Sequence, residues 1–560
     1  MKCKVIDGLV KEAGPTRFVV VTGGVISSVG KGILASSLAK LVEAQGYKVG
    51  AVKIDPYINV DAGTMRPTEH GEVYVTADGF EADQDLGNYE RFTDIVTTHK
   101  NSITTGQIYW QVISDEREGK YDGKCVEVIP QIPLEVIRRI HEVVTAQKPD
   151  FLFIEIGATA GEYQIFPFLD AIRRMRFSGM PVRVVHLGYV PVPDKVGEQK
   201  TKPLQRSIFD LLSVGVCPDF VVGRSSQPLD DDRKNKIALN CSIKRKNVFS
   251  AYDCDLVYEV PVVLHQQGMD VRLLDEFDID YHESEEYRKW EALVQKIKEL
   301  KDEVKIYIVG KYFDTGKFTL EDSYISIIEA VKHAAWHCGA KPVIKWVDSK
   351  EFEKHPDRLN RLDDADCLII PGGFGASGIE GKISAIKYAR ENKIPFLGLC
   401  YGLQLAVIEF ARHKCGLADA HTTEIDPKTK APVIDILPEQ KKNLKDKNFG
   451  ASMRLGEQPA TLKEGTIARK YYGTENISER HRHRWEVNRR YVSELEKKGL
   501  VISGINEDKN LVEFIELPES VHPYFVATQA HPEFKSKFMK PSPLFTGLIE
   551  NGIKKKNKTN

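Results

Sequence analysis

The chain has 560 residues, and 79 Lys and Arg against 80 Asp and Glu give a formal net charge of −1. This length predicts roughly two to four domains with real apolar cores. The neutral balance argues against a general nucleic-acid binder, and no apolar run approaches the length of a membrane span. Nine cysteines without a C-x-x-C pair indicate neither a disulfide framework nor a zinc ribbon and favour a reducing, cytoplasmic compartment.

The first half of the chain predicts alternating strands and helices. An apolar strand at 18–21 runs through a glycine-rich loop into an amphipathic helix that carries Ile33, Leu34 and Leu38 at helical spacing. Further strands are predicted at about 49–54, 151–154 and 182–185. This alternation is typical of a parallel α/β sheet.

The composition changes between about 274 and 303, where charged residues and helix formers predict a linker with one helix. A second α/β pattern follows, with strands at 304–310, 368–370 and 396–399. The predicted fold class is therefore α/β with two domains, a P-loop-like parallel-sheet nucleotide-binding domain at 1–274 and a second α/β domain at 304–560, joined by the linker at 275–303. The lysine-rich end at 551–560 is predicted to be a solvated tail.

A cysteine nucleophile is indicated in the second domain. Cys400 stands in a G-x-C-x-G pattern between a strand and a helix, which is the spacing of a nucleophile elbow, and the helix N-terminus favours thiolate. His531 and Glu533 follow a later strand and supply a base and a group to orient it. The glycines of 371–375 can present N–H groups to an oxyanion. Cys400 alone would be interpreted as a core thiol, but these features together favour a catalytic one.

A phosphate-binding loop is predicted at 23–32, between the first strand and its helix. Backbone N–H groups at a helix N-terminus bind phosphate, and Lys31 adds a positive charge. The loop departs from a strict Walker A pattern because it is one residue too long and has Gly32 after the lysine. Lys53 leaves the second strand as another candidate phosphate ligand.

Two carboxylates are candidate Mg²⁺ ligands. Glu155 ends the strand at 151–154, where α/β sheets place ligand chemistry, and Asp85 lies in an acidic loop. Mg²⁺ retains several waters and takes few protein carboxylates, although each residue alone could be an isolated acid. The lysines of 200–202 and Lys236 could bind a second triphosphate or be solvated.

In chain order, these segments resemble the CTP synthase family, in which a synthetase domain precedes a class I glutamine amidotransferase domain. The resemblance rests on VTGGVISSVGKG, KIDPYINVDAGTM, KTKPLQ, PGGFG and ERHRHRWEVN and spans about 18–544. It implies a ligase of pyrimidine biosynthesis that aminates UTP to CTP through a 4-phosphorylated UTP. The ammonia would come from glutamine through a Cys-His-Glu triad and pass between the domains.

The resemblance also implies a role for each matching residue. The triad is Cys400, His531 and Glu533, and the glutamine contacts are Gly373, Phe374, Tyr401, Gln404, Glu424 and Arg484. The ATP contacts are Ser27, Ser28, Val29, Gly30, Lys31, Gly32, Lys53 and Asp85, and the Mg²⁺ ligands are Asp85 and Glu155. The UTP and CTP contacts are Ser27, Glu162, Tyr163, Gln164, Lys200, Thr201, Lys202, Gln205 and Lys236, with His70 at the ammonia entrance. Arg480, Arg482 and His483 are either pocket residues or a charged rim.

The implied partners are ATP with Mg²⁺, UTP, glutamine, GTP as activator, and CTP as product and feedback inhibitor, with no organic prosthetic group. A cytoplasmic homotetramer that binds neither nucleic acid nor membrane is implied, and filament formation stays open. Glu162 and Gln164 replace the family's usual Asp and Glu beside the CTP site, which predicts altered UTP affinity or weaker CTP inhibition. Ser377 replaces an arginine tied to GTP activation, whereas Arg454 is retained.

Three other functions share parts of this pattern. A cobyrinic acid amidating enzyme also joins an ATP domain to a glutaminase, but the DPYINVD and KTKP segments favour UTP. GMP synthetase is disfavoured because its glutaminase precedes its synthetase domain. A filament-forming or regulatory homologue without activity is disfavoured by the presence of both reaction centres.

Overall fold

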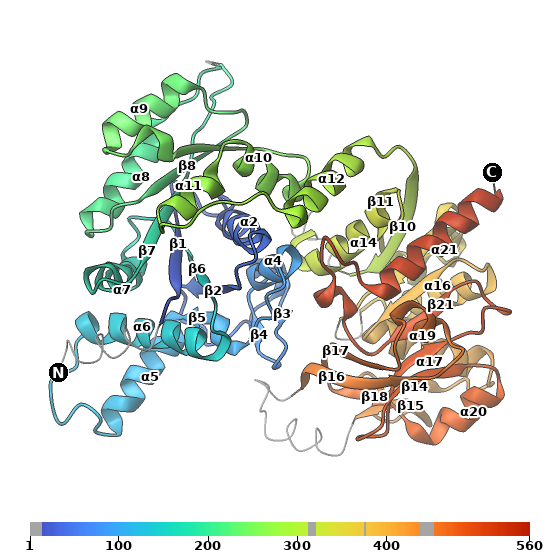
Figure 1. Cartoon of the computed structure of the whole chain (residues 1–560). Coiled ribbons are helices and arrows are strands. Elements are labelled where there is room, and N and C mark those ends of the chain that lie inside the picture. The colour runs from blue at the N-terminus through green and yellow to red at the C-terminus, as the bar shows by residue number, and fades with distance from the viewer. Residues whose placement is uncertain (1–13, 196, 312–320, 374–376, 437–452, 560) are drawn as a thin grey trace. The chain divides into compact units, whose positions relative to one another are not determined.

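The computed structural model describes residues 14–195, 197–311, 321–373, 377–436 and 453–559, in two compact units (Figure 1). The first unit is the chain up to Asp61 together with Asp85–Gln295, and the second is Ala62–Gln84 together with the chain from Lys296. The boundary at Gln295 lies inside helix α12 (Glu285–Glu299), the helix expected in the linker. The sequence did not predict that residues 62–84 belong with the second unit.

Among its described residues, the first unit has a parallel seven-stranded sheet with the order β5-β2-β6-β1-β7-β8-β9. The strands are β1 (Arg17–Gly24), β2 (Val49–Asp55), β5 (Ser102–Thr104), β6 (Phe151–Ile156), β7 (Val182–Tyr189), β8 (Phe220–Ser225) and β9 (Val248–Tyr252). The four strands predicted for this unit are confirmed, and their apolar runs are buried on both faces, as a parallel sheet requires.

Successive strand residues point to opposite faces of the sheet, so both of its faces are apolar and both are covered by helices. Phe18 and Val20 of β1 share one apolar cluster with Ile137 and Ile172, while α2 packs against β1, β2 and β6. The helices are α2 (Lys31–Ala44), α4 (Asp85–Phe92), α5 (Thr105–Arg117), α6 (Val128–Gln147), α7 (Phe166–Phe177), α8 (Lys202–Ser213), α9 (Asp231–Cys241), α10 (Val260–Gln266) and α11 (Met269–Asp275).

In its described part, the second unit has a mixed nine-stranded sheet with the order β11-β10-β12-β13-β21-β20-β19-β16-β17. The strands are β10 (Glu303–Gly310), β11 (Lys341–Asp348), β12 (Cys367–Ile370), β13 (Phe396–Leu399), β16 (Arg454–Leu462), β17 (Asn476–His483), β19 (Val501–Asn506), β20 (Leu511–Glu516) and β21 (Phe525–Thr528). Strands β11 to β21 in this order are parallel, and the remaining pairs are antiparallel.

Helices and a smaller sheet complete the second unit. The helices are α14 (Ile325–His337), α15 (Ser349–Lys354), α16 (Ile379–Glu391), α17 (Tyr401–His413), α19 (Ile467–Tyr472), α20 (Val492–Lys497) and α21 (Pro543–Thr559). The smaller sheet has the order β14 (Ala420–Thr422), β15 (Ala431–Ile436) and β18 (Trp485–Val487). The strands predicted in this half of the chain are confirmed.

Residues 62–84, here called the inserted segment, form helix α3 (Pro67–His70) and the paired strands β3 (Tyr74–Val75) and β4 (Glu81–Ala82). The Tyr74 hydroxyl donates to the Phe534 carbonyl at 3.1 Å, and Arg480 donates to the Val75 carbonyl at 3.1 Å. A Cβ on Gly456 would lie 2.5 Å from the backbone nitrogen of Gly79, so this close approach requires glycine. The inserted segment is therefore tightly built into the second unit.

The expectation of a solvated tail is wrong up to Thr559, because α21 continues through it. Lys555 donates to the Ala365 carbonyl at 2.9 Å, and Lys556 donates to the Glu303 carbonyl at 2.6 Å. Lysines in the last turns also complement the negative end of the helix dipole. The lysine cluster therefore ends a docked helix.

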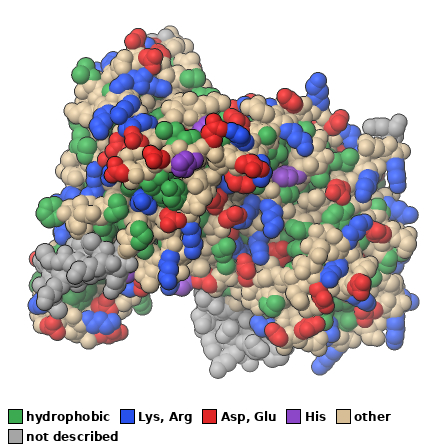
Figure 2. All heavy atoms as spheres, in the orientation of Figure 1, with side chains coloured by type: hydrophobic (Ala, Val, Ile, Leu, Met, Phe, Trp, Pro, Cys, Tyr) green, Lys and Arg blue, Asp and Glu red, His purple; other side chains and the backbone are tan. Residues whose placement is uncertain are grey.

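The surface matches the balanced charge of the sequence. On the face shown in Figure 2, Lys and Arg side chains are interspersed with Asp and Glu side chains. Within the described ranges, no helix is both long enough and apolar enough to cross a membrane.

Candidate active sites

Cys400 occupies the sharp turn from β13 into α17, as the G-x-C-x-G pattern predicts. Its φ of 51° and ψ of −100° form a backbone conformation that residues with a side chain rarely adopt. The Cys400 N–H donates to the Thr528 carbonyl at 2.7 Å, and a Cβ on Gly402 would lie 2.3 Å from the Ile370 carbonyl oxygen. The elbow therefore places the thiol at the start of α17, where the helix dipole favours thiolate.

The predicted partners of Cys400 follow β21, the strand beside β13. His531 Nδ1 and Glu533 Oε1 are 2.7 Å apart, and Cys400, His531 and Glu533 line one solvent-open pocket. Burial opposes the imidazolium, but the charges of Glu533 and Cys400 outweigh it and raise the pKa of His531 to about 10. The arrangement suits a thiolate–imidazolium pair.

Replacing Glu533 with Gln is expected to lower the pKa of His531, because the amide keeps the shape and removes the negative charge. The imidazolium exists below this pKa and is lost as pH rises through it. In the pH–rate profile of glutamate release, the decline at high pH should therefore begin at least about one pH unit lower than in the wild type. Glu519→Gln is a matched control, since Glu519 pairs with Lys470 at the surface. An unchanged decline at high pH would show that Glu533 does not stabilise the protonated form of His531.

The loop after β12 contributes Gly372 and Gly373 to the same pocket. A Cβ on Gly372 would lie 2.9 Å from His531 Cε1 and 3.6 Å from Cys400 Cβ, so glycine lets the backbone approach both side chains. The backbone N–H groups of this loop and those that begin α17 at Tyr401 are the candidates to hold an oxyanion. Phe374, the remaining residue predicted here, lies outside the described residues.

The predicted glutamine contacts combine complementary polar groups. Gln404 Nε2 donates to the Trp485 carbonyl at 2.8 Å, and Gln404 Oε1 is buried without a hydrogen-bond partner among the described residues. Burial lowers the pKa of Arg484, and the charge of Glu424 is among those that oppose this shift. A buried acceptor and a carboxylate can pair with the α-amine of glutamine, and a guanidinium can pair with its α-carboxylate.

The inserted segment supplies a wall of the Cys400 pocket that the sequence did not predict. Pro67, Glu72 and Val73 line this pocket together with Cys400. Glu72 accepts hydrogen bonds from the N–H, at 3.1 Å, and the hydroxyl of Ser326. His70 ends α3 in the same segment, with Nε2 3.1 Å from an Asp83 oxygen. The family resemblance singles out His70 in this segment, but only the fold shows that its neighbours line the Cys400 pocket.

The arginine- and histidine-rich run of β17 is not the charged rim that was one expectation. Arg480 and His483 are 1% and 2% exposed. Arg480 donates to the Tyr74 hydroxyl at 2.6 Å, and Arg482 donates to Glu81 at 2.7 Å and lines the Cys400 pocket. The run therefore binds the inserted segment.

The phosphate-loop residues lie where β1 meets α2, at the carboxyl edge of the parallel sheet. Lys31 folds over Gly23, where a Cβ would lie 2.7 Å from Lys31 Cδ, and its Nζ donates to the Ala158 carbonyl at 3.0 Å. Burial lowers the pKa of Lys31, while Glu155 opposes this shift. Ser28 and Ala158 have φ of 54° and 60°, and such strain clusters at ligand sites.

Lys53, Asp85 and Glu155 form one charged cluster beside the start of α2. Lys53 Nζ contacts Asp85 and lies 3.0 Å from Glu155 Oε1. A Cβ on Gly32 would lie 3.2 Å from Asp85 Oδ1 and 3.4 Å from Glu155 Oε2, so the departure from Walker A leaves room between both carboxylates and the helix. The described residues contain no group of three or more His, Cys, Asp or Glu able to hold a metal. Two carboxylates fit Mg²⁺, which takes its other ligands from phosphates and water.

The predicted UTP contacts form two local groups. Gln164 Nε2 donates to Glu162 at 2.6 Å, and Gln205 Nε2 donates to the Thr201 hydroxyl at 3.0 Å. Lys236 lies exposed on α9. In the part of the chain that the structure describes, no hydrogen bond or ion pair joins the 162–164 group to residues 200–205.

The structure has an apolar cavity beside the phosphate loop that the sequence did not predict. Its walls include Gly30, Ile33 and Leu34. Arg224 also lines it and donates to the Val29 carbonyl at 2.9 Å. An apolar slot next to a phosphate loop suits a nucleobase, but its residues come from several elements and form no motif.

Comparisons with known proteins agree with both halves of this arrangement. Residues 17–279 match the family model of the CTP synthase N-terminus, and residues 319–551 match that of class-I glutamine amidotransferase. CTP synthase of Pyrococcus abyssi is 49% identical over 538 residues, covering 96% of this chain and 97% of its own. CTP synthase of Methanopyrus kandleri is 49% identical, covering 95% and 98%. A solved Trypanosoma brucei CTPS glutaminase domain with bound acivicin is 33% identical with a TM-score of 0.41, covering 45% of this chain and 94% of its own.

Proposed function

Because this chain belongs to the CTP synthase family, we propose that its two units divide the ATP-dependent amination of UTP to CTP. The observation that carries the proposal is a pair of distinct sites in one chain. The second unit holds the Cys400 pocket, and the first holds the lysine loop with its carboxylates. The test is CTP formation by the purified chain from UTP, ATP and Mg²⁺ with either glutamine or ammonia. No CTP from either nitrogen source would contradict the proposal.

In the second unit, the Cys400 thiolate attacks the carboxamide carbon of glutamine. His531 gives its proton to the leaving nitrogen, so ammonia departs and a thioester remains. Water, deprotonated by His531, then attacks the thioester and releases glutamate. Glu533 orients His531, and the N–H groups of Gly373 and Tyr401 hold the oxyanion. Gln404, Glu424 and Arg484 hold the amino-acid end of glutamine.

In the first unit, Lys31 and Lys53 neutralise the phosphates of ATP. The γ-phosphoryl group passes to O4 of UTP, ammonia attacks C4, and phosphate leaves. Asp85 and Glu155 would hold Mg²⁺, which supplies charge neutralisation at the phosphates. The cavity beside Gly30 takes the adenine base.

The UTP and ammonia contacts are also part of the proposal. UTP is held by Ser27, Glu162, Tyr163, Gln164, Lys200, Thr201, Lys202, Gln205 and Lys236. His70 lies at the ammonia entrance, which is supported by the wall that its segment gives to the Cys400 pocket. A closed route would keep ammonia from being protonated by solvent.

We further propose GTP as activator and a cytoplasmic homotetramer. Large apolar side chains of the first unit support assembly, since Trp110, Ile113 and Phe177 are 72%, 58% and 94% exposed. The described cysteines are free thiols, in keeping with a reducing compartment. Light scattering of the purified chain tests the assembly, and a monomer with full activity would contradict it.

CTP inhibition is expected to be weak because the Gln164 amide and Thr159 occupy the Glu162 carboxylate. In Gln164→Glu, the amide donor is lost and two carboxylates repel, which frees Glu162 for a ligand. CTP inhibition should strengthen by about 3- to 10-fold, measured as the CTP concentration for half inhibition at fixed UTP. Equal inhibition of both proteins would refute the role of this pair.

A further inference from the structure

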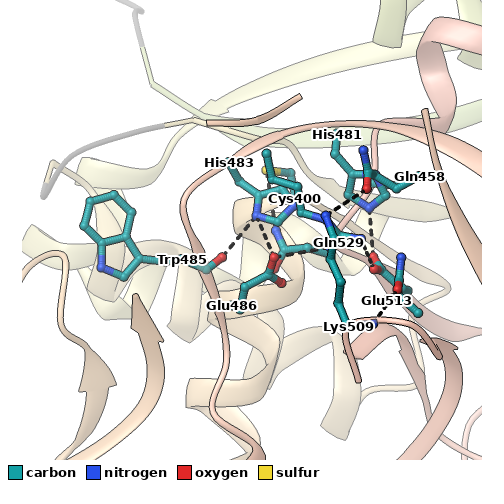
Figure 3. Close-up of polar contacts among 12 residues, drawn as sticks. Cys400, Gln458, His481, His483, Trp485, Glu486, Lys509, Glu513 and Gln529 are labelled. Carbon is teal, nitrogen blue, oxygen red and sulfur yellow. Dashed lines mark hydrogen bonds and ion pairs between the residues drawn. The ribbon is translucent and has the colours of Figure 1, made fainter. Parts of the chain in front are cut away.

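Gln529 lies between β21 and His531 and is fully buried. Its backbone N–H donates to the Glu513 carbonyl at 2.9 Å, which fixes the start of the side chain. Its side-chain Nε2 donates to Cys400 Sγ at 3.7 Å (Figure 3). The sulfur therefore has a polar neighbour outside the Cys-His-Glu group.

Two neighbours fix which way the Gln529 amide points. The Trp485 carbonyl can only accept, so Gln404 must turn its nitrogen toward it, at 2.8 Å. The second hydrogen on that nitrogen goes to Gln529 Oε1, at 3.3 Å. With this oxygen engaged, the Gln529 nitrogen must face Cys400, because a flipped amide would set two donors against each other.

The surroundings of the sulfur distinguish thiol from thiolate. An S–H group can donate to the Arg482 carbonyl, 3.8 Å away, whereas a thiolate is repelled by that oxygen. The amide of Gln529 favours the thiolate instead, because a hydrogen bond to an ionised acceptor is about twice as strong as one to a neutral acceptor. The carbonyl of Arg482 therefore favours the thiol, and the amide of Gln529 favours the thiolate.

We infer that Gln529 is a further catalytic residue of the glutaminase reaction, which holds the Cys400 thiolate through its side-chain N–H. The inference rests on the proposed nucleophilic role of Cys400. The same donor acts when the thioester is hydrolysed. The attacking water gives its proton to His531, the C–S bond breaks, and the electron pair returns to sulfur opposite the Gln529 N–H.

Other ionisable groups surround the sulfur and stay unchanged in the test. His531 and Glu533 after β21 and Arg482 of β17 line the pocket of Cys400. Figure 3 also shows His481 and His483 of β17, Glu486 of β18 and Glu513 of β20. A change in the titration of Cys400 after substitution of Gln529 therefore reports the lost donor.

The test compares wild type with Gln529→Met, which keeps the length but removes the donor, and with Gln529→Glu, which keeps the shape but adds an anion. Peptide-resolved alkylation of Cys400 by iodoacetamide across a pH series gives the apparent pKa of the thiol. We expect an increase of about one unit for Gln529→Met and a larger one for Gln529→Glu. The kcat for CTP from glutamine should fall by about 10- to 100-fold, while CTP still forms from ammonia.

Gln458→Met is the matched control, since Gln458 of β16 donates only to the Leu455 carbonyl among the described residues. If the Gln529 substitution acted only by displacing Gln404, it would raise the KM for glutamine and leave the pKa of the Cys400 thiol unchanged. An unchanged alkylation profile in Gln529→Met overturns the inference. If that variant fails to fold, Gln529→Asn decides by the same measurement, because it keeps an uncharged amide but is one methylene too short to reach the sulfur. Cys400→Ser with wild-type glutamine use would instead overturn the nucleophilic role of Cys400.

Discussion

Cys400→Ala should abolish CTP synthesis from glutamine and leave CTP synthesis from ammonia intact. The loss should reach at least about 10⁴-fold, because removing the nucleophile of a catalytic group costs most of its rate enhancement. Alanine fits the elbow, since it only shortens a side chain that is already buried. The synthetase residues lie in the other unit, so external ammonia should still reach C4 of UTP.

The control for this variant is Cys415→Ala, which removes a half-buried free thiol from the same unit and should keep both activities. Both syntheses are followed as CTP formed from UTP, with saturating glutamine or with ammonium salt. Loss of both activities in Cys400→Ala would contradict two separable sites. Persistent use of glutamine would contradict the assignment of the nucleophile.

Lys31→Met should suppress CTP synthesis from either nitrogen source, by about 10²- to 10³-fold. Methionine keeps the apolar stem over Gly23 but removes the charge meant for the ATP phosphates. In the described structure, Lys31 has one carbonyl contact and no ion pair, and burial lowers its pKa. A buried charge without a carboxylate partner costs stability, so the variant should unfold at the same temperature as wild type or higher.

Lys40→Met is the matched control on the same helix, because Lys40 pairs with Glu43 at 3.0 Å, away from the loop. It should keep wild-type CTP formation. In Lys31→Met, alkylation of Cys400 should stay normal, since its pocket lies in the other unit. Unchanged ATP use by Lys31→Met would remove Lys31 from the phosphate site.

Local patterns predict the features that local forces determine. The strands at 18–21 and 396–399 follow from short apolar runs between glycines, and the elbow at Cys400 follows from glycines that tolerate a sharp turn. These short local motifs are also the ones that carry the resemblance to the family. The family matches exclude the cobyrinic acid amidating enzyme and GMP synthetase as alternatives.

Other features depend on contacts that a sequence pattern does not contain. The bond from Gln529 to Cys400 joins residues 129 positions apart and needs the orientation of Gln404. Gly32 departs from the Walker A pattern, and only the neighbouring carboxylates show what its missing Cβ permits. The lysine-rich end was misjudged because composition cannot show that α21 docks beside Ala365.

The inserted segment means that the second unit is not a continuous stretch of sequence. The backbone passes between the units after Asp61, again after Gln84 and finally after Gln295. A fragment that begins at Lys296 would lack Pro67, Glu72 and Val73 of its own pocket wall and would expose the Arg480 side chain. Cutting the linker would likewise leave a piece of the second unit covalently attached to the first. For protein engineering, a truncation that removes residues 62–84 from the second unit is therefore expected to weaken its glutaminase site, whereas single substitutions can separate the two activities without removing this wall.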